Sequence, residues 1–200
     1  MSLIPGGFQL GATNALSSNV MRKLLALALV FGATTASAAP SDVRVYESQE
    51  DEAITQGETT LLVDPDAAYA AATDYKRWAE MFPDIKQVYV TRLIGTDARV
   101  TFVHADGNRD NLHFHNQPGA RMVWFEDTGG RAEVWAEIVF IPGDTPGTTR
   151  VRSRLYVDVH GLASLVVSDG KLRGIRQKRV RDDLSNLRSY FERTMATAMR

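Results

Sequence analysis

Histidine is the residue type in this sequence best suited to moving protons or binding a metal near neutral pH, and the chain holds four. His113 and His115 alternate along a predicted strand and share one face, and His104 lies on the neighbouring strand. Two imidazoles could ligate one metal ion, but the sequence assigns no third ligand, so we predict no metal site. Phe114 is expected to point inward, which directs both histidines to solvent. A register slip of one residue would instead turn them toward the interior.

The sequence lacks other common catalytic residues and motifs. The chain contains no cysteine, which excludes thiol nucleophiles, disulfides and zinc–cysteine sites. It has no Gly-x-Ser-x-Gly elbow, and Ser153, Ser164 and Ser168 have no His/Asp pattern near them other than His160. A glycine-rich phosphate-binding loop is also missing. We therefore predict no catalytic residue and no cofactor, and expect function to come from elements that enclose an apolar space.

The composition favours one globular domain. Hydrophobic residues make up 44% of the 200 positions, and 7 Pro and 15 Gly are too few for a collagen-like or disordered chain. The formal net charge of −1 does not suit a generic polyanion binder. The charge is uneven, because residues 171–200 hold nine Lys/Arg and three Asp/Glu residues while residues 39–170 are acidic. The sequence thus describes an acidic body with a basic C-terminal segment.

The N-terminal region reads as a secretory signal peptide. Two cations at positions 22 and 23 precede an almost unbroken apolar run over 24–31, and Ala36-Ser37-Ala38 matches the A-x-A cleavage pattern. The apolar run is far shorter than the ~20 residues that a membrane span needs. We predict cleavage after Ala38 and a periplasmic or secreted location. The predicted organisation is an unstructured extension or misassigned start over 1–20, a signal peptide over 21–38 and a single domain over 39–200.

The elements that would enclose an interior space follow a clear order. A strand over 59–63 precedes a helix from Asp66 to about Met81, for which Asp64 is a suitable N-cap and Pro65 a suitable first residue. Residues 171–199 form a long amphipathic helix. Between the helices the apolar period is two, and turns separate six strands of an antiparallel meander near 86–94, 98–104, 110–115, 121–127, 131–141 and 149–160. This order predicts an α+β fold, in which one helical stripe covers one apolar sheet face.

The same order resembles the START-like superfamily of polyketide cyclases, coenzyme-Q-binding proteins and lipid-transfer domains (SRPBCC type). The resemblance rests on Asp74-x3-Trp78-x3-Phe82-Pro83 followed by a β-run, and on residues 136–142, where Ala and Ile replace the family's frequent Gly and Trp. It covers residues 53–195. It implies a helix-grip fold, in which a curved antiparallel sheet of about six to seven strands wraps around the long C-terminal helix and leaves an elongated apolar cavity.

Side chains on the inner face of the strands and on one stripe of the helix are the candidate cavity lining. Ala136 and Ser153 are small on a face otherwise built from large residues, which leaves room for a ligand. The predicted lining consists of Phe102, Phe114, Trp124, Ala136, Ile138, Phe140, Ser153, Leu155, Val157, Leu172, Ile175, Leu184 and Leu187.

Our leading hypothesis is a carrier or binding protein for a hydrophobic small molecule such as a lipid, fatty acid or isoprenoid quinone, held by the apolar area removed from water. The alternative is an enzyme of the cyclase or aromatase type, in which His104, His113 or Tyr89 would move a proton. Export argues against this alternative, because polyketide intermediates are usually made in the cytoplasm. A third interpretation is an interaction module whose cavity is vestigial.

The segment Lys171–Arg181 holds six cations in eleven positions. One interpretation is a solvated helix face, with i,i+4 ion pairs from Lys178 to Asp182 and from Arg179 to Asp183. The other is transient contact with anionic lipid headgroups, which would suit a carrier that loads at a membrane. Export excludes nucleic acid as a partner. The apolar residues 162–167 are either a lid that touches lipid or a short segment buried at the end of the sheet.

Overall fold

The computed structural model describes residues 43–127, 132–159 and 168–198. The predicted signal peptide, the extension over 1–20, His160 and the candidate lid over 162–167 lie outside the described residues. Within the described part, no helix combines the length and the hydropathy that a membrane span requires.

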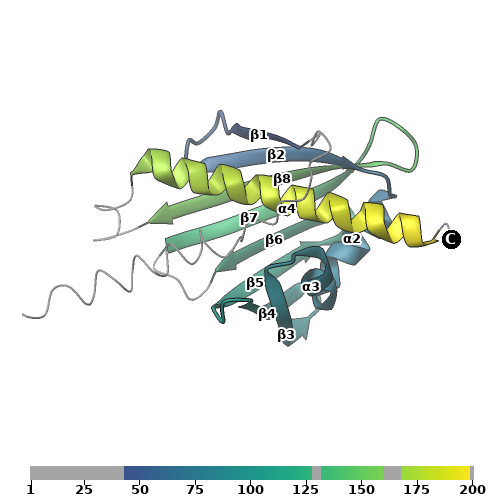
Figure 1. The fold of residues 1–200 in the computed structure, drawn as a ribbon, viewed down its shortest axis with the longest axis horizontal. Helices are drawn as coiled ribbons and strands as arrows, with labels where there is room; N and C mark the ends of the chain where they lie inside the picture. The colour runs from purple at the N-terminus through teal and green to yellow at the C-terminus, as the bar shows by residue number, and fades with distance from the viewer. Residues whose placement is uncertain (1–42, 128–131, 160–167, 199–200) are drawn as a thin grey trace, which may run out of the picture.

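An antiparallel sheet of eight strands, in the order β1-β2-β8-β7-β6-β5-β4-β3, forms one layer of the fold (Figure 1). The predicted meander is present, with each strand from β3 to β8 paired to the next. The strand count exceeds the six to seven expected, because the charged stretch over 42–58 contains a separate edge strand, β1, as well as the first part of β2. The strands are β1 (Arg44–Glu47), β2 (Ile54–Leu61), β3 (Ile85–Ile94), β4 (Asp97–His104), β5 (Arg109–Gln117), β6 (Met122–Asp127), β7 (Ala132–Pro142) and β8 (Thr149–Val159).

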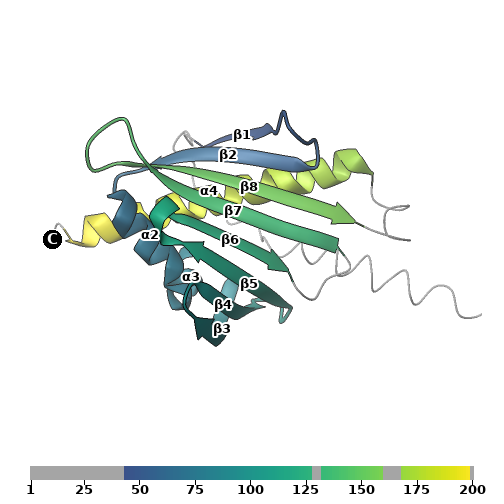
Figure 2. The ribbon, with the colours of Figure 1, turned by 180° about the vertical axis from the view of Figure 1, so that it is seen from behind.

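The long helix α4 (Asp169–Ala198) crosses one face of this sheet, and Figure 2 shows the opposite face with α4 behind it. Its buried stripe includes Val180, Leu184 and Leu187, as the amphipathic pattern predicts. The helix approaches β2 closely because Gly57 has no side chain. A Cβ there would lie 2.4 Å from Val180 Cγ1 and 2.8 Å from Leu184 Cδ1. The predicted helix-grip α+β architecture is confirmed.

The prediction of one continuous helix over 66–81 is wrong, because the helix is interrupted. The chain forms α2 (Pro65–Thr73), a 3-10 turn (Tyr75–Arg77) and the short α3 (Trp78–Met81). The break occurs at Asp74, whose φ of −83° and ψ of 79° are not helical. The start is as predicted, since the Asp64 side chain accepts a hydrogen bond from the backbone N–H of Asp66 at 2.9 Å.

The break turns Trp78 into the core. Its Nε1 donates to the carbonyl oxygen of Ala72 at 2.9 Å, and its ring stacks on Phe102 with 5.2 Å between centroids. Phe114 contacts the same indole edge-on at 5.3 Å and the ring of Phe125 at 5.0 Å. Such aromatic pairs fill the β4–β6 end of the inner face with solid core. The remaining space lies toward β7, β8 and α4.

Candidate functional site

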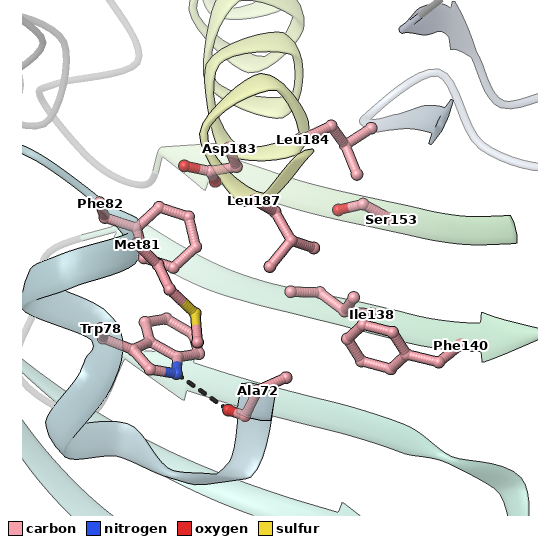
Figure 3. A pocket seen from close by; sticks show the side chains of 10 residues that line it. All are labelled: Ala72, Trp78, Met81, Phe82, Ile138, Phe140, Ser153, Asp183, Leu184 and Leu187. Atoms are coloured by element: carbon pink, nitrogen blue, oxygen red, sulfur yellow. Dashed lines mark hydrogen bonds between the residues drawn. The ribbon is translucent and has the colours of Figure 1, made fainter. Parts of the chain in front are cut away.

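A narrow apolar cavity lies between α4, the α2–α3 segment and strands β7 and β8 (Figure 3). The volume available to the centre of a water molecule is about 20 Å³, enough for about one water. Three side chains of the wall carry a polar group. The indole N–H of Trp78 is already bonded to the carbonyl oxygen of Ala72, so the hydroxyl of Ser153 and the carboxyl of Asp183 are the groups that could meet a ligand. The lining consists of Ala72, Trp78, Met81, Phe82, Ile138, Phe140, Ser153, Asp183, Leu184 and Leu187.

Pairing between β7 and β8 explains why space remains here. Ile138 lies directly opposite Ser153, so a small residue faces a large one across the ladder. Ser153 is buried although it is polar. On the other side of the cavity stands Met81, whose unbranched thioether chain adapts its shape to a ligand more readily than a branched side chain.

The structure brings five of the predicted lining residues into the cavity wall: Ile138, Phe140, Ser153, Leu184 and Leu187. Others are buried on the same inner surface away from the cavity, namely Ala136, Leu155, Val157 and Leu172, while Ile175 is half-buried on α4. Phe102 and Phe114 belong to the aromatic cluster around Trp78.

Trp124 requires a correction. It lies on the outer face of the sheet, where its ring contacts His115 at a centroid distance of 4.9 Å. Its neighbours Val123 and Phe125 face the core instead. Because successive side chains of a strand point to opposite faces, Trp124 cannot share their side. It therefore does not line the cavity.

The α2–α3 wall was not anticipated as part of the lining. Trp78 and Phe82 stand out in the sequence as apolar residues four apart, but a straight helix over 66–81 would not bring them beneath α4. Asp183 was predicted as a surface partner of Arg179. That ion pair is present, with Arg179 Nε donating to Asp183 Oδ2 at 2.8 Å, yet the carboxyl also borders the cavity (Figure 3).

The carboxyl of Asp183 is perturbed by its surroundings. Burial raises its pKa to about 6, the charge of Arg179 opposes the rise, and the charge of Asp84 adds to it. Its Oδ1 atom is buried and has no hydrogen-bond partner among the described residues. A group with these properties changes its charge near neutral pH at the wall of an apolar cavity. It is suited to hydrogen bonding with a ligand or to general acid–base chemistry.

His104 lies beneath the same part of α4 in a buried network. Its Nδ1 is 3.2 Å from Asp84 Oδ2, and its Nε2 is 2.7 Å from Asp110 Oδ2. Burial disfavours the imidazolium, but the hydrogen bonds and charges of Asp110 and Asp84 outweigh burial and raise the pKa of His104 to about 9. The charges of both aspartates also act on Arg179 and help to raise its pKa. His104 is thus held as a cation between two carboxylates.

The other proposed proton carriers lie away from the cavity. Tyr89 is exposed on the edge strand β3. His113 and His115 lie on the outer face, because Phe114 between them is completely buried on the inner one. Their ring centroids are 4.1 Å apart, and the carboxylate of Asp97 lies close enough to form a three-residue group with them. His104 does not belong to this group.

In the basic segment Lys171–Arg181 of α4, some cations are buried or paired with acids and others are exposed to solvent. Arg176 is buried, donates to the carbonyl oxygen of Glu52 at 2.7 Å, and lies 3.6 Å from the carboxylate of Glu47. Arg179 faces Asp183, and the predicted ion pair between Lys178 and Asp182 is present. The side chains exposed to solvent are Lys171, Arg173, Lys178 and Arg181.

Comparison with solved structures places this geometry in a known fold. A protein from Thermus thermophilus matches with a TM-score of 0.60 and 18% identity over 70% of this chain and 98% of its own. A START superfamily protein from Mycobacterium smegmatis matches with a TM-score of 0.58 and 11% identity over 70% and 98% of the two chains. The Zhui aromatase/cyclase from Streptomyces matches with a TM-score of 0.57 and 12% identity over 76% and 96%.

No protein-family model and no curated protein matches the sequence. At these low identities the likeness to solved structures is one of fold. The chain therefore has a START-like, helix-grip fold of the SRPBCC type, as the sequence resemblance indicated.

Proposed function

We propose that this protein binds a hydrophobic small molecule, such as a lipid or an isoprenoid quinone, in the cavity beneath α4. The observation that carries the proposal is the lining itself, an apolar enclosure with only two polar side-chain groups free to meet a ligand, Ser153 on β8 and Asp183 on α4. Ligand sites in proteins have this character, with apolar area for affinity and a few polar groups for orientation. The START superfamily protein and the aromatase/cyclase that match this chain share its fold.

The cavity is too small to hold such a ligand without a change in structure. A ligand site commonly holds several hundred Å³, whereas this cavity admits about one water molecule. Binding must therefore separate α4 from the α2–α3 wall or move side chains such as Met81 and Leu187. Besides the cavity side chains, Arg77 Nη1 donates to Tyr190 Oη at 3.5 Å and Arg193 Nη2 donates to the carbonyl oxygen of Glu80 at 3.4 Å. Opening would break these two contacts between the walls but no sheet hydrogen bond.

Native mass spectrometry of freshly purified protein, followed by organic extraction, tests this binding. A co-purifying apolar compound that is released by denaturation would support the proposal. A protein that carries no such compound and also fails to take up the uncharged probe N-phenyl-1-naphthylamine would contradict it.

We propose further that the protein is exported and acts as a periplasmic or secreted carrier. The support is the signal-peptide pattern over 21–38, and cleavage after Ala38 would remove none of the residues that the structure describes. Intact-mass analysis of the protein from its native cell tests this. A mature chain beginning at Ala39 is expected, and one that retains residues 24–31 would overturn the proposal.

Loading at a membrane is part of the carrier proposal. The exposed cations Lys171, Arg173, Lys178 and Arg181 would contact anionic headgroups, each contributing about 1 kcal/mol near such a surface. Vesicles with anionic phosphatidylglycerol should therefore retain the protein, and vesicles of phosphatidylcholine should not. Equal retention on both would exclude this contact.

A second function, proton transfer in an enzyme of the cyclase or aromatase type, is favoured by one observation. Asp183, with a pKa of about 6, borders the cavity and pairs with the cation of Arg179. Its carboxylate would accept a proton from carbon next to a ketone, leaving an enolate, and return it at another position. Deuterium exchange into 2-decanone in D₂O, read by mass spectrometry, tests this. Exchange should be accelerated by the wild type and lost in Asp183→Asn, while probe binding persists.

A further inference from the structure

We propose that Asp97, His113 and His115 form a binding site for a divalent transition-metal ion of the Zn²⁺ class on the outer face of the sheet. The site is independent of the cavity, because these side chains lie on the face opposite α4. The ligand atoms of the three residues all lie within 4.8 Å of one another. Two imidazole nitrogens and one carboxylate oxygen are a ligand set that Zn²⁺ commonly takes.

Strand register creates this set. His113 and His115 are two residues apart on β5, and Asp97, the first residue of β4, lies directly opposite His115. The carboxylate oxygen Oδ1 of Asp97 is 2.6 Å from Nδ1 of His115. Sequence alone offered the two histidines, placed His104 on the neighbouring strand and assigned no third ligand. The third ligand comes from the hairpin pairing that the register establishes.

A metal ion needs little rearrangement of these groups. Tetrahedral ligands at about 2.1 Å from Zn²⁺ lie roughly 3.4 Å from one another. The side chains of His113, His115 and Asp97 are 24%, 34% and 51% exposed, so rotation can bring the ligand atoms together without disturbing the core. Partial exposure also gives the ion a path from solvent.

Neighbouring groups on β6 would support the ligands. Glu126 Oε1 lies 3.6 Å from Nδ1 of His113, the position from which a carboxylate orients a ligating imidazole and leaves Nε2 for the metal. The indole of Trp124 packs against His115 and restricts its ring. Both residues are directly opposite the histidines they contact, Glu126 opposite His113 and Trp124 opposite His115.

The remaining coordination position would open onto a surface pocket of about 220 Å³. Asp97 and His113 line this pocket together with Arg92 and Arg99. Two guanidinium groups oppose a bare dication but favour an anion or hydroxide as the fourth ligand. The geometry therefore describes a three-ligand site with an open position rather than a closed structural site.

Isothermal titration of the tag-free protein with ZnCl₂ tests the proposal. We expect one Zn²⁺ per chain, and at least tenfold weaker affinity in each of His113→Asn, His115→Asn and Asp97→Asn. Glu126→Gln should weaken binding by about 10- to 100-fold, the usual effect of losing an orienting carboxylate. The matched control His160→Asn removes an imidazole that is not one of the proposed ligands and should bind like the wild type. Circular dichroism of each variant establishes that the fold is retained.

The indole of Trp124 supplies a second readout. Co²⁺ bound beside His115 should quench its fluorescence, and this quenching should disappear in Trp124→Phe while Zn²⁺ affinity stays within a fewfold of the wild type. The proposal is overturned if the wild type binds no Zn²⁺, or if the double variant His113→Asn/His115→Asn binds it with unchanged affinity.

Discussion

At the scale of single residues, two titratable groups, Asp183 on α4 and His104 on β4, respond to burial in different ways. Asp183 faces a largely apolar wall with one cation beside it, so burial dominates and its pKa rises to about 6. His104 has a carboxylate on each ring nitrogen, so hydrogen bonds and charge from the two aspartates outweigh burial and its pKa rises to about 9. Both groups therefore hold their protons in the folded protein to a higher pH than in the unfolded chain.

Asp183 should make ligand binding depend on pH. An apolar ligand removes water from the carboxyl, which costs less when the group is neutral. We predict that the affinity for N-phenyl-1-naphthylamine falls severalfold between pH 5 and 7, about the pKa of 6. Fluorescence titration at each pH measures this. Asp183→Asn should bind with the same affinity throughout, and a variant that keeps the wild-type pH dependence would rule out Asp183 as its source.

His104 should make folding stability depend on pH in a higher window. Its folded pKa of about 9 exceeds the ordinary 6.5, so its stabilising effect is complete below pH 6.5 and is lost as pH rises to 9. The free energy of unfolding should fall by up to about 3 kcal/mol across this range. Urea unfolding at pH 6 and pH 9.5 measures the fall. In His104→Gln most of this difference should be lost, although the variant is less stable at pH 6; an equal fall in both proteins would refute the assignment.

The sequence predicts such charged pairs only when the two partners lie close together along the chain. The pair of Arg179 with Asp183 follows from helical spacing and is present. The network of Asp84, His104 and Asp110 joins the start of β3 to β4 and β5, and no local pattern indicates it. Trp124 was assigned to the wrong face because residues 122–125 are all apolar, so the alternation that identifies an inner face is missing.

At the scale of elements, the closeness of α4 to the sheet depends on Gly57. Any side chain there would meet Val180 and Leu184. We predict that Gly57→Ala destabilises the protein by about 1–3 kcal/mol through overpacking. Gly174, on the exposed side of α4, is the matched control, because no atom lies within 4 Å of the position that a Cβ would occupy there. Gly174→Ala should stabilise by about 0.5–1 kcal/mol.

Urea unfolding of the two alanine variants makes the comparison. If Gly57→Ala were as stable as Gly174→Ala, the close approach of helix and strand would not be a constraint on the fold. The α4 helix and the meander were predictable because apolar periodicity and turn residues mark them. The break at Asp74 was not, since residues 67–72 favour helix and the break is stabilised by the docking of Trp78 on distant strands.

At the scale of the whole molecule, the sheet carries two unlike faces. The inner face and α4 enclose the apolar cavity, whereas the outer face carries His113, His115 and Trp124 beside paired charges such as Arg152 with Glu58. The START-like fold was predictable from the order of elements, and the solved structures share it. The shape of the cavity was not, because it depends on how the α2–α3 segment packs against Leu184 and Leu187.

Paired variants of the cavity wall test whether the ligand binds in the cavity beneath α4, as proposed. Leu187→Ala should enlarge the cavity, cost about 2–5 kcal/mol of stability and strengthen binding of N-phenyl-1-naphthylamine. Ser153→Leu should fill the cavity and abolish binding. Val180→Ala, also buried on α4 but outside the lining, should leave the affinity unchanged.

Fluorescence titration of the four proteins at pH 5, with folding verified by circular dichroism, is the decisive measurement. We expect the highest affinity in Leu187→Ala, an equal and lower affinity in the wild type and Val180→Ala, and no binding in Ser153→Leu. Equal affinity in all four proteins would show that the probe binds elsewhere and would contradict the assignment of the cavity as the ligand site.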